Sequence, residues 1–222
     1  MDRDSRFVTP ILTAQRAGVH LGVPTSTIKT WLGSMAGGAP VMHSVEPEAP
    51  KAPRIPFVAL AEAQILRELR NTGLSMQHIR AGVARLREQT REEYVLAIHT
   101  IATDGGVLLY NAASRVAPEW VRAHDGQAAI KEVVDNLVKY VHYADDGFAD
   151  RLVLRPYQAA HVIIDPRFGF GQPILEAAKV RVDTIADLFY GGRESVETIA
   201  EEYDLSTAEV EDVLRVTARR VA

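Results

Sequence analysis

The chain has 222 residues and no cysteine. Without cysteine there are no disulfides, thiolate zinc sites or cysteine nucleophiles, and the composition fits a reducing cytoplasm, where we expect the protein to reside. The sequence also lacks an apolar run near the roughly 20 residues that cross a bilayer. Its first residues lack the apolar stretch of a signal peptide. We therefore expect no membrane association.

Motifs for metal and phosphate are also missing. The seven histidines are scattered, and no pair has the spacing of metal ligands on one helix. The run Gly169-Phe170-Gly171 lacks the lysine that would follow it in a phosphate cradle. We therefore expect no metal and no cofactor. Since 47% of the residues are apolar and 24% are charged, the chain is typical of a globular protein.

Charge is distributed unevenly along the chain, although its formal total is only −4. Residues 1–91 hold 12 Lys and Arg against 7 Asp and Glu, a net of +5. Residues 92–160 have a net of −4, and residues 161–222 a net of −5. A basic first part on an acidic body favours binding of a polyanion at one end. These three ranges are the domains that the sequence predicts.

Two short helices separated by a tight turn are predicted near the start of the chain. The apolar pattern indicates a first helix over 12–21, and Gly22-Val23-Pro24 then supplies a turn. A second helix runs to about Leu32, with the hydroxyls of residues 25–27 available as N-caps. The segment from Gly33 to Pro56 is too rich in glycine and proline to be a helix, and we interpret it as an irregular wing.

The second helix presents short polar side chains and a cation, which a helix lying in the DNA major groove requires. In that geometry Lys29 and the neighbouring hydroxyls reach phosphates or base edges. The alternative from spacing alone is an ordinary helical hairpin whose threonines only cap a helix. The predicted DNA-binding residues are Arg16, Thr25, Ser26, Thr27, Lys29, Thr30 and Arg54.

The remaining pattern indicates a mainly helical α+β protein, with a β-β-α-β unit in the middle and a three-helix, helix-turn-helix-like unit at the end. The further helices are expected at 57–69, 76–86, 127–143, 183–190, 195–203 and 206–217. The strands are expected at 94–98, 107–110, 151–154, 162–164 and 180–182. Asp104-Gly105-Gly106 is a good hairpin turn between the first two strands, and Ser206 with Glu209 predicts a capping box.

The run from Thr13 to Leu32 resembles the first two helices of MerR-like winged helix-turn-helix proteins. In that pattern a small residue packs between the helices, hydroxyls and a cation face DNA, and a tryptophan packs beneath the wing. The corresponding residues here are Ala17, Ser26, Thr27, Lys29 and Trp31. Lysine stands where the family usually has arginine, which disfavours bidentate contacts. The effector cysteines of that family are absent, so metal sensing is not implied.

Most of residues 161–216 resembles a small antitoxin domain that genomes commonly pair with a toxin of PIN-like ribonuclease fold. The matching segments are IDPRFGFGQP at 164–173, RVDTIAD at 181–187, GGRESV at 191–196 and IAEEYDLS at 199–206. With the N-terminal match, the chain resembles a VapB-type antitoxin of a type II toxin–antitoxin system. This resemblance implies a homodimer that neutralises a ribonuclease toxin and binds operator DNA to repress its own transcription.

The last unit also has the spacing of a helix-turn-helix, but its net charge of −5 opposes contact with phosphate. An acidic surface instead suits a basic RNA-binding groove on a ribonuclease. The predicted partner-binding residues are Phe168, Glu194, Glu197 and Glu201. Phe168, Phe170 and Tyr190 are either apolar anchors of such a contact or domain core, and the core is the favoured interpretation for Phe170 and Tyr190.

Two other functions fit parts of the sequence. A MerR-like regulator would sense a small molecule through residues 92–160 and would need no toxin. A metal-dependent nuclease would use converging carboxylates, for which the candidates are Asp145, Asp146 and Asp150, with Asp104. Three of these share one loop with Gly147, where a solvated turn is the default interpretation. We therefore expect no catalytic residues and no enzymatic activity.

Overall fold

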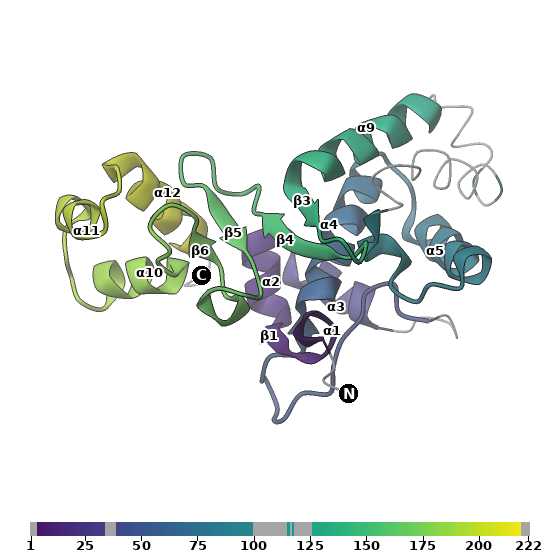
Figure 1. The fold of residues 1–222 in the computed structure, drawn as a ribbon, viewed down its shortest axis with the longest axis horizontal. Coiled ribbons are helices and arrows are strands. Elements are labelled where there is room, and N and C mark those ends of the chain that lie inside the picture. The colour runs from purple at the N-terminus through teal and green to yellow at the C-terminus, as the bar shows by residue number, and fades with distance from the viewer. Residues whose placement is uncertain (1–3, 34–38, 100–114, 116, 118–125, 219–222) are drawn as a thin grey trace.

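The computed structural model describes residues 4–33, 39–99, 115, 117 and 126–218. Helices predominate in this part of the chain and two small sheets accompany them, so the predicted α+β class is confirmed. Figure 1 shows three C-terminal helices at one end of the molecule, and the larger sheet in the middle, above the first N-terminal helices. None of the described helices combines the length and apolarity that crossing a bilayer requires.

The N-terminal part is built around one buried helix. Its elements are α1 (Ser5–Val8), β1 (Pro10–Leu12), α2 (Ala14–Leu21), α3 (Thr25–Leu32), β2 (Ile55–Pro56), α4 (Phe57–Asn71) and α5 (Met76–Thr90). Strands β1 and β2 pair antiparallel, and α4 follows β2 directly. Twelve of the 15 residues of α4 are buried, so this helix is the centre against which α1, α2 and α5 pack.

The larger sheet is antiparallel and has the order β3-β4-β5-β6. Helix α9 (Gly126–Tyr140) leads into it, and its strands are β3 (Val141–Tyr143), β4 (Ala149–Val153), β5 (Val162–Ile164) and β6 (Ile174–Leu175). The strands expected at 151–154 and 162–164 are therefore confirmed to within two residues. Since β4 pairs with β5, backbone hydrogen bonds of one sheet join residues on both sides of the predicted boundary at residue 160.

The first predicted hairpin differs from the structure. Residues 95–97, expected in a strand, form the 3-10 helix η1 (Val95–Ala97). All three side chains are buried and η1 packs on α4 and α5, so the alternation of a half-exposed strand is absent. Only Ile98 makes an isolated bridge, to Phe148. The predicted strand at 107–110 and the turn at 104–106 lie outside the described residues.

Two further expectations need correction. The helix predicted over 127–143 ends at Tyr140, because its last three residues pair with β4 as strand β3. The strand predicted at 180–182 does not form, because Val182 already begins a helix and Arg181 makes only an isolated bridge to Ile174. In the first case pairing with another strand, rather than local spacing, decides the structure.

Three helices close the described chain: α10 (Val182–Tyr190), α11 (Val196–Tyr203) and α12 (Thr207–Thr217), as predicted to within one residue. Ser195 Oγ accepts a hydrogen bond from the Thr198 N–H at 3.1 Å and so caps α11. Ser206 and Glu209 form the predicted capping box at the start of α12. These local caps explain why the sequence alone locates both helices.

Helix α12 is tied to the loop between β4 and β5 through Asp212. Its Oδ2 accepts hydrogen bonds from the N–H groups of Ala159 at 2.8 Å and Ala160 at 3.0 Å, and also from Gln158. Arg215 pairs with the other carboxylate oxygen. Burial alone would raise the pKa of Asp212, but these hydrogen bonds outweigh burial and lower the pKa below its ordinary value.

Replacing Asp212 with asparagine should lower the free energy of unfolding by roughly 1–3 kcal/mol, because a neutral amide accepts three N–H groups less strongly than a carboxylate does. Since the native pKa is lowered, the carboxylate stabilises the fold above its ordinary pKa of 3.8 and loses that effect as pH falls through the native value. Urea denaturation from about pH 7 to about pH 3 measures both effects, and the variant should lose less stability on acidification.

The matched control is Asp135→Asn, which removes a carboxylate from the exposed Lys131–Asp135 pair on α9. Exposed pairs of this kind contribute about 0–1 kcal/mol. If Asp212→Asn were no more destabilising than Asp135→Asn, Asp212 would not hold α12 to the loop.

Candidate nucleic-acid interface

Helices α2 and α3 form the tight turn that the sequence predicts. Gly22 ends α2 with a φ of 65°, a left-handed conformation that favours glycine. The Val23 N–H donates to the Gly18 carbonyl at 2.8 Å, and the Gly22 N–H donates to the Val19 carbonyl at 3.2 Å. These bonds satisfy carbonyls at the helix end that would otherwise lack partners.

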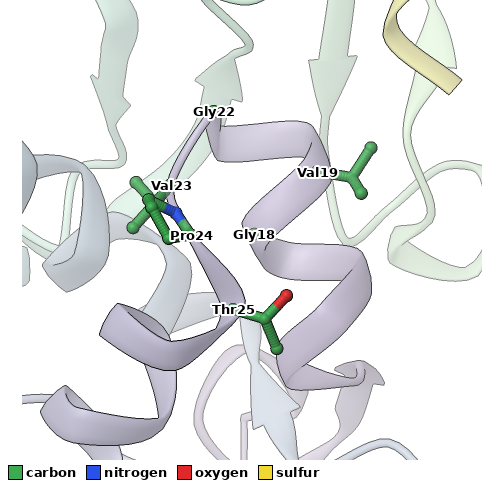
Figure 2. Close-up of a pocket in the computed structure, with 6 residues that line it drawn as sticks. All are labelled: Gly18, Val19, Gly22, Val23, Pro24 and Thr25. Carbon is green, nitrogen blue, oxygen red and sulfur yellow. The ribbon is translucent and has the colours of Figure 1, made fainter. Parts of the chain in front are cut away.

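A close approach inside this turn requires glycine at residue 18. A Cβ there would lie 2.6 Å from the Val23 carbonyl oxygen. Figure 2 shows Gly18 on α2 opposite Pro24 and Thr25, and the six residues labelled in that view line an open pocket of about 270 Å³. Gly18 was not among the predicted site residues. An isolated glycine inside a helical run is the sequence feature that points to it.

The outer face of α3 is polar. Ser26 and Lys29 are exposed, whereas the side chains of Thr25, Thr27 and Thr30 are half-buried. The expected hydroxyl cap is absent, because α3 begins at Thr25 and Pro24 therefore holds the N-cap position without a side-chain hydrogen bond. Thr30 Oγ1 instead donates to the Ser26 carbonyl at 2.9 Å. The most accessible groups of α3 are thus a hydroxyl and an ammonium.

The opposite face of α3 fixes its orientation. Trp31 is 1% exposed, and its carbonyl accepts hydrogen bonds from the N–H groups of Val41 and Met42, both at 3.2 Å. The segment after α3 therefore folds back beside this tryptophan. Arg80 of α5 donates to a carbonyl in the last turn of α3 at 2.6 Å. Ala17, expected to pack between the two helices, is fully buried.

A buried carboxylate anchors the predicted wing. Glu62 of α4 is fully buried, accepts the His43 N–H at 2.8 Å, and lies 2.6 Å from His43 Nδ1. Arg87 of α5 lies 3.8 Å from the same carboxylate. At the far end, the Arg54 N–H donates to the Leu12 carbonyl at 3.1 Å. In its described part, residues 39–54, the segment is irregular but held at both ends.

The predicted cationic contacts have different surroundings. Lys29 is exposed on α3. Arg16 is half-buried and forms an ion pair with Asp183 on α10. Arg54 Nη2 donates to Ser44 Oγ at 3.2 Å. Because Arg16 must leave or share Asp183 to reach a phosphate, Lys29 is the more directly available cation.

The predicted partner-binding residues lie in the C-terminal unit. Phe168 is 45% exposed, Glu197 and Glu201 are exposed on α11, and Glu194 is half-buried just before it. Hydrogen bonds from its own backbone N–H and from Ser195 lower the pKa of Glu197, so this carboxylate is charged at neutral pH. Figure 1 places α11 at the end of the molecule farthest from α5.

The prediction that Phe170 and Tyr190 belong to the core is wrong. Their exposed fractions are 91% and 48%. Phe170 has a left-handed φ of 56° in the 3-10 turn η2 (Gly169–Gly171), which presents its ring to solvent. Tyr190 ends α10, and its hydroxyl donates to the Leu214 carbonyl at 3.3 Å. Phe170 lies in a turn and Tyr190 at the end of a helix, so neither occupies the middle of an apolar helix face.

Of the carboxylates considered for a nuclease, Asp104 lies outside the described residues, and the other three do not converge. Asp146 pairs with Arg6, and this hydrogen-bonded pair lowers the pKa of Asp146. Asp150 lies 3.3 Å from Arg167, and Asp145 is exposed. Among the residues that the structure describes, no three potential metal ligands come together.

One small pocket borders the described part of the middle region. A pocket of about 80 Å³ lies between α4 and α9, and it is lined by Glu68, Asn71, Thr72, Glu132, Val133 and Asn136. Sites for small organic molecules commonly enclose about 300–1,000 Å³. Most of residues 100–125 lies outside the described ranges, so small-molecule sensing through 92–160 stays a prediction.

Two families match separate parts of the chain. Residues 10–83, from β1 into α5, match the family described as "Putative DNA-binding HTH domain". Residues 162–215, from β5 into α12, match the family described as "Protein of unknown function (DUF433)". The first match contains both α2 and α3, so a helix-turn-helix in this position is supported independently of spacing.

Two similarities extend over nearly the whole chain. The curated "Putative antitoxin VapB45" of Mycobacterium tuberculosis is 29% identical over 232 residues, which cover 96% of each chain. The crystal structure of Rv2018 from Mycobacterium tuberculosis superposes with a TM-score of 0.76 and 28% identity, over 94% of this chain and 99% of that one. The likeness therefore includes both ends of the fold and the sheet between them.

Gly18→Ala should lower the free energy of unfolding by roughly 1–3 kcal/mol, because the new methyl group would meet the Val23 carbonyl at 2.6 Å. Gly82→Ala is the matched control, since a Cβ at Gly82 on α5 meets nothing within 4 Å. That change should raise the free energy of unfolding by up to about 1 kcal/mol, because alanine favours a helix over glycine. Thermal and urea denaturation compare the two, and a Gly18→Ala protein as stable as Gly82→Ala would refute the close approach.

Proposed function

We propose that this chain is a DNA-binding antitoxin of a type II toxin–antitoxin system. It binds and neutralises a ribonuclease toxin, and it binds operator DNA to repress its own transcription. The observation that carries this proposal is the similarity to a protein named as an antitoxin over 96% of both chains. The match of residues 10–83 to a DNA-binding helix-turn-helix family supports the second activity. Both roles are binding roles rather than catalytic ones.

Helix α3 supplies the DNA contact in this proposal. Its accessible Ser26 and Lys29 enter the major groove, with the threonine hydroxyls beside them, while Trp31 and its partners hold the helix from behind. The lysine ammonium is a point charge and cannot make the paired hydrogen bonds of an arginine guanidinium. Lys29 therefore contributes more to affinity than to base recognition. Arg16 and Arg54 contact flanking phosphates, and Arg16 exchanges Asp183 for a phosphate on binding.

The acidic face of α11 supplies the toxin contact. Glu197 and Glu201 are exposed there, with Glu194 at its start. A ribonuclease needs a basic groove to hold RNA, and carboxylates placed over that groove exclude the substrate. The same charges repel phosphate, which assigns DNA and toxin to different surfaces of the molecule. A PIN-like fold for the toxin belongs to this proposal.

The proposal includes a homodimer in the cytoplasm, because operators with two half-sites are read by proteins with two-fold symmetry. Residues 1–91 bind DNA, residues 92–160 link, and residues 161–222 bind the toxin. The β4–β5 pairing joins the second and third ranges. Truncation at residue 160 would remove two strands from a four-stranded sheet, so single substitutions are the better test.

Lys29→Ala should weaken binding to the DNA upstream of the gene, and it should reduce the slope of log affinity against log salt by about one. Removing one phosphate contact releases one counterion fewer. Lys139→Ala, which removes an exposed cation on α9, is the control and should change neither quantity. Fluorescence anisotropy from about 50 to about 200 mM salt measures both. Identical curves for the two variants would remove Lys29 from the interface.

In this proposal the neighbouring gene encodes the toxin. Glu201→Lys should weaken inhibition of that toxin several-fold, most strongly at low salt, because a favourable charge becomes a repulsive one. Glu132→Lys makes the same charge change at an exposed position on α9 and should leave inhibition intact. Ribonuclease assays with the purified pair, and rescue of cells that express the toxin, provide the readouts. Equal inhibition by both variants would exclude the acidic face of α11 from the toxin contact.

A further inference from the structure

The turn η2 presents an aromatic ring in an unusual way. Phe170 is 91% exposed, although phenylalanine is among the residues that folding most favours burying. Its φ of 56° is left-handed, which is uncommon for any residue other than glycine and more so for a bulky one. The flanking Gly169 and Gly171 are also left-handed, with φ of 56° and 71°. Three consecutive left-handed residues project this ring away from the fold.

This projection is built into the structure. A Cβ at Gly169 would lie 2.7 Å from Ile174 Cγ2, and a Cβ at Gly171 would lie 2.9 Å from Ile11 Cγ2, so both glycines are packed against neighbouring strands. Gln172 Nε2 donates to the Ile11 carbonyl at 2.7 Å, which fastens the turn to β1. The ring is therefore held out by a fixed backbone.

The segment that leads into η2 carries aromatic and charged groups. Phe168 is 45% exposed, and Lys179 Nζ lies 5.1 Å from the centroid of its ring. Arg167 is hydrogen-bonded to Asp165 at 2.6 and 2.9 Å and lies 3.3 Å from Asp150, so two carboxylates compensate its charge. Exposed aromatics with arginine and compensated charge are typical of the anchor region of a protein–protein interface. A nucleic-acid site would instead carry an excess of positive charge.

We infer that Phe170, with Phe168 beside it, is an aromatic anchor that inserts into an apolar pocket on the toxin. The inference rests on the proposed function and adds a second contact to the acidic face of α11. A projecting ring requires a concave partner, and a backbone already fixed in η2 loses little conformational entropy on binding. Because η2 packs against Ile11 of β1, the anchor stands where the C-terminal unit meets β1.

The test uses the full chain and the purified protein encoded by the neighbouring reading frame. Phe170→Ala should weaken binding about 30-fold, the size of an anchor residue's effect, and the loss should be insensitive to salt. Phe170→Gly should weaken binding as much while the melting temperature stays equal or rises, because glycine favours the left-handed conformation. Phe170→Tyr should restore most of the affinity. Val8→Ala, at a position that is 37% exposed on α1, is the control and should bind as the wild type does.

The outcomes separate this inference from the proposal beneath it. If the wild type binds the toxin and Phe170→Ala binds equally well, the anchor is wrong and the antitoxin function stands. If the wild type does not bind the neighbouring protein, the proposed function fails and the anchor fails with it. If Phe170→Ala instead changes DNA affinity or the sedimentation of the chain alone, the ring serves DNA or a second copy, and the inference is overturned.

Discussion

Helix α4 is buried along most of its length, and two of its buried side chains, Glu62 and Glu68, are carboxylates. A buried charge must be paired, and removing one partner costs about 3–5 kcal/mol. Glu62 holds His43 of the wing and lies near Arg87, whereas Glu68 pairs with Arg155 and accepts a hydrogen bond from Asn136 of α9 at 3.3 Å. The same helix thereby fixes the wing on one side and the sheet with α9 on the other. The orientation of α3 depends on this arrangement, since its C-terminal end is held by the wing and by α5.

Helices α3 and α11 carry opposite chemistry. Helix α3 offers hydroxyls and an ammonium on a frame fixed by Trp31 and Arg80, whereas α11 offers carboxylates. The parts of the chain that hold these helices pack directly against each other: Arg16 of α2 pairs with Asp183 of α10, and Gln172 is bonded to β1. In the proposed function, a polyanion and a basic partner therefore bind different surfaces of one folded chain.

Local features of the sequence predicted most of the helices. Gly22, Ser75, Ser195 and Ser206 each end or cap a helix through neighbours within five residues, so the residue types alone indicate the boundary. Strands β3 and β6 and the 3-10 helix η1 were not predicted, because distant pairing and burial decide them. The candidate nucleic-acid interface shows the same contrast between local features, which the sequence reveals, and distant contacts, which it does not. Lys29 and Ser26 follow from helical spacing, whereas the Arg16–Asp183 pair joins residues 167 positions apart. The sequence favours a core position for Phe170, because apolar periodicity does not reveal the left-handed turn that exposes its ring.

The most direct test of whether DNA and the toxin bind different surfaces is hydrogen–deuterium exchange of the full chain. Exchange is measured for the chain alone, with upstream DNA, and with the protein that the neighbouring gene encodes. Amides of the α2–α3 pair should be protected by DNA, whereas amides of η2 and α11 should be protected by the protein partner. A bound partner slows amide exchange where it covers or stabilises the backbone, so the amides protected by each partner identify the surface that binds it. Protection of α11 by DNA, or of α3 alone by the protein partner, would contradict the assignment of the two functions to separate surfaces.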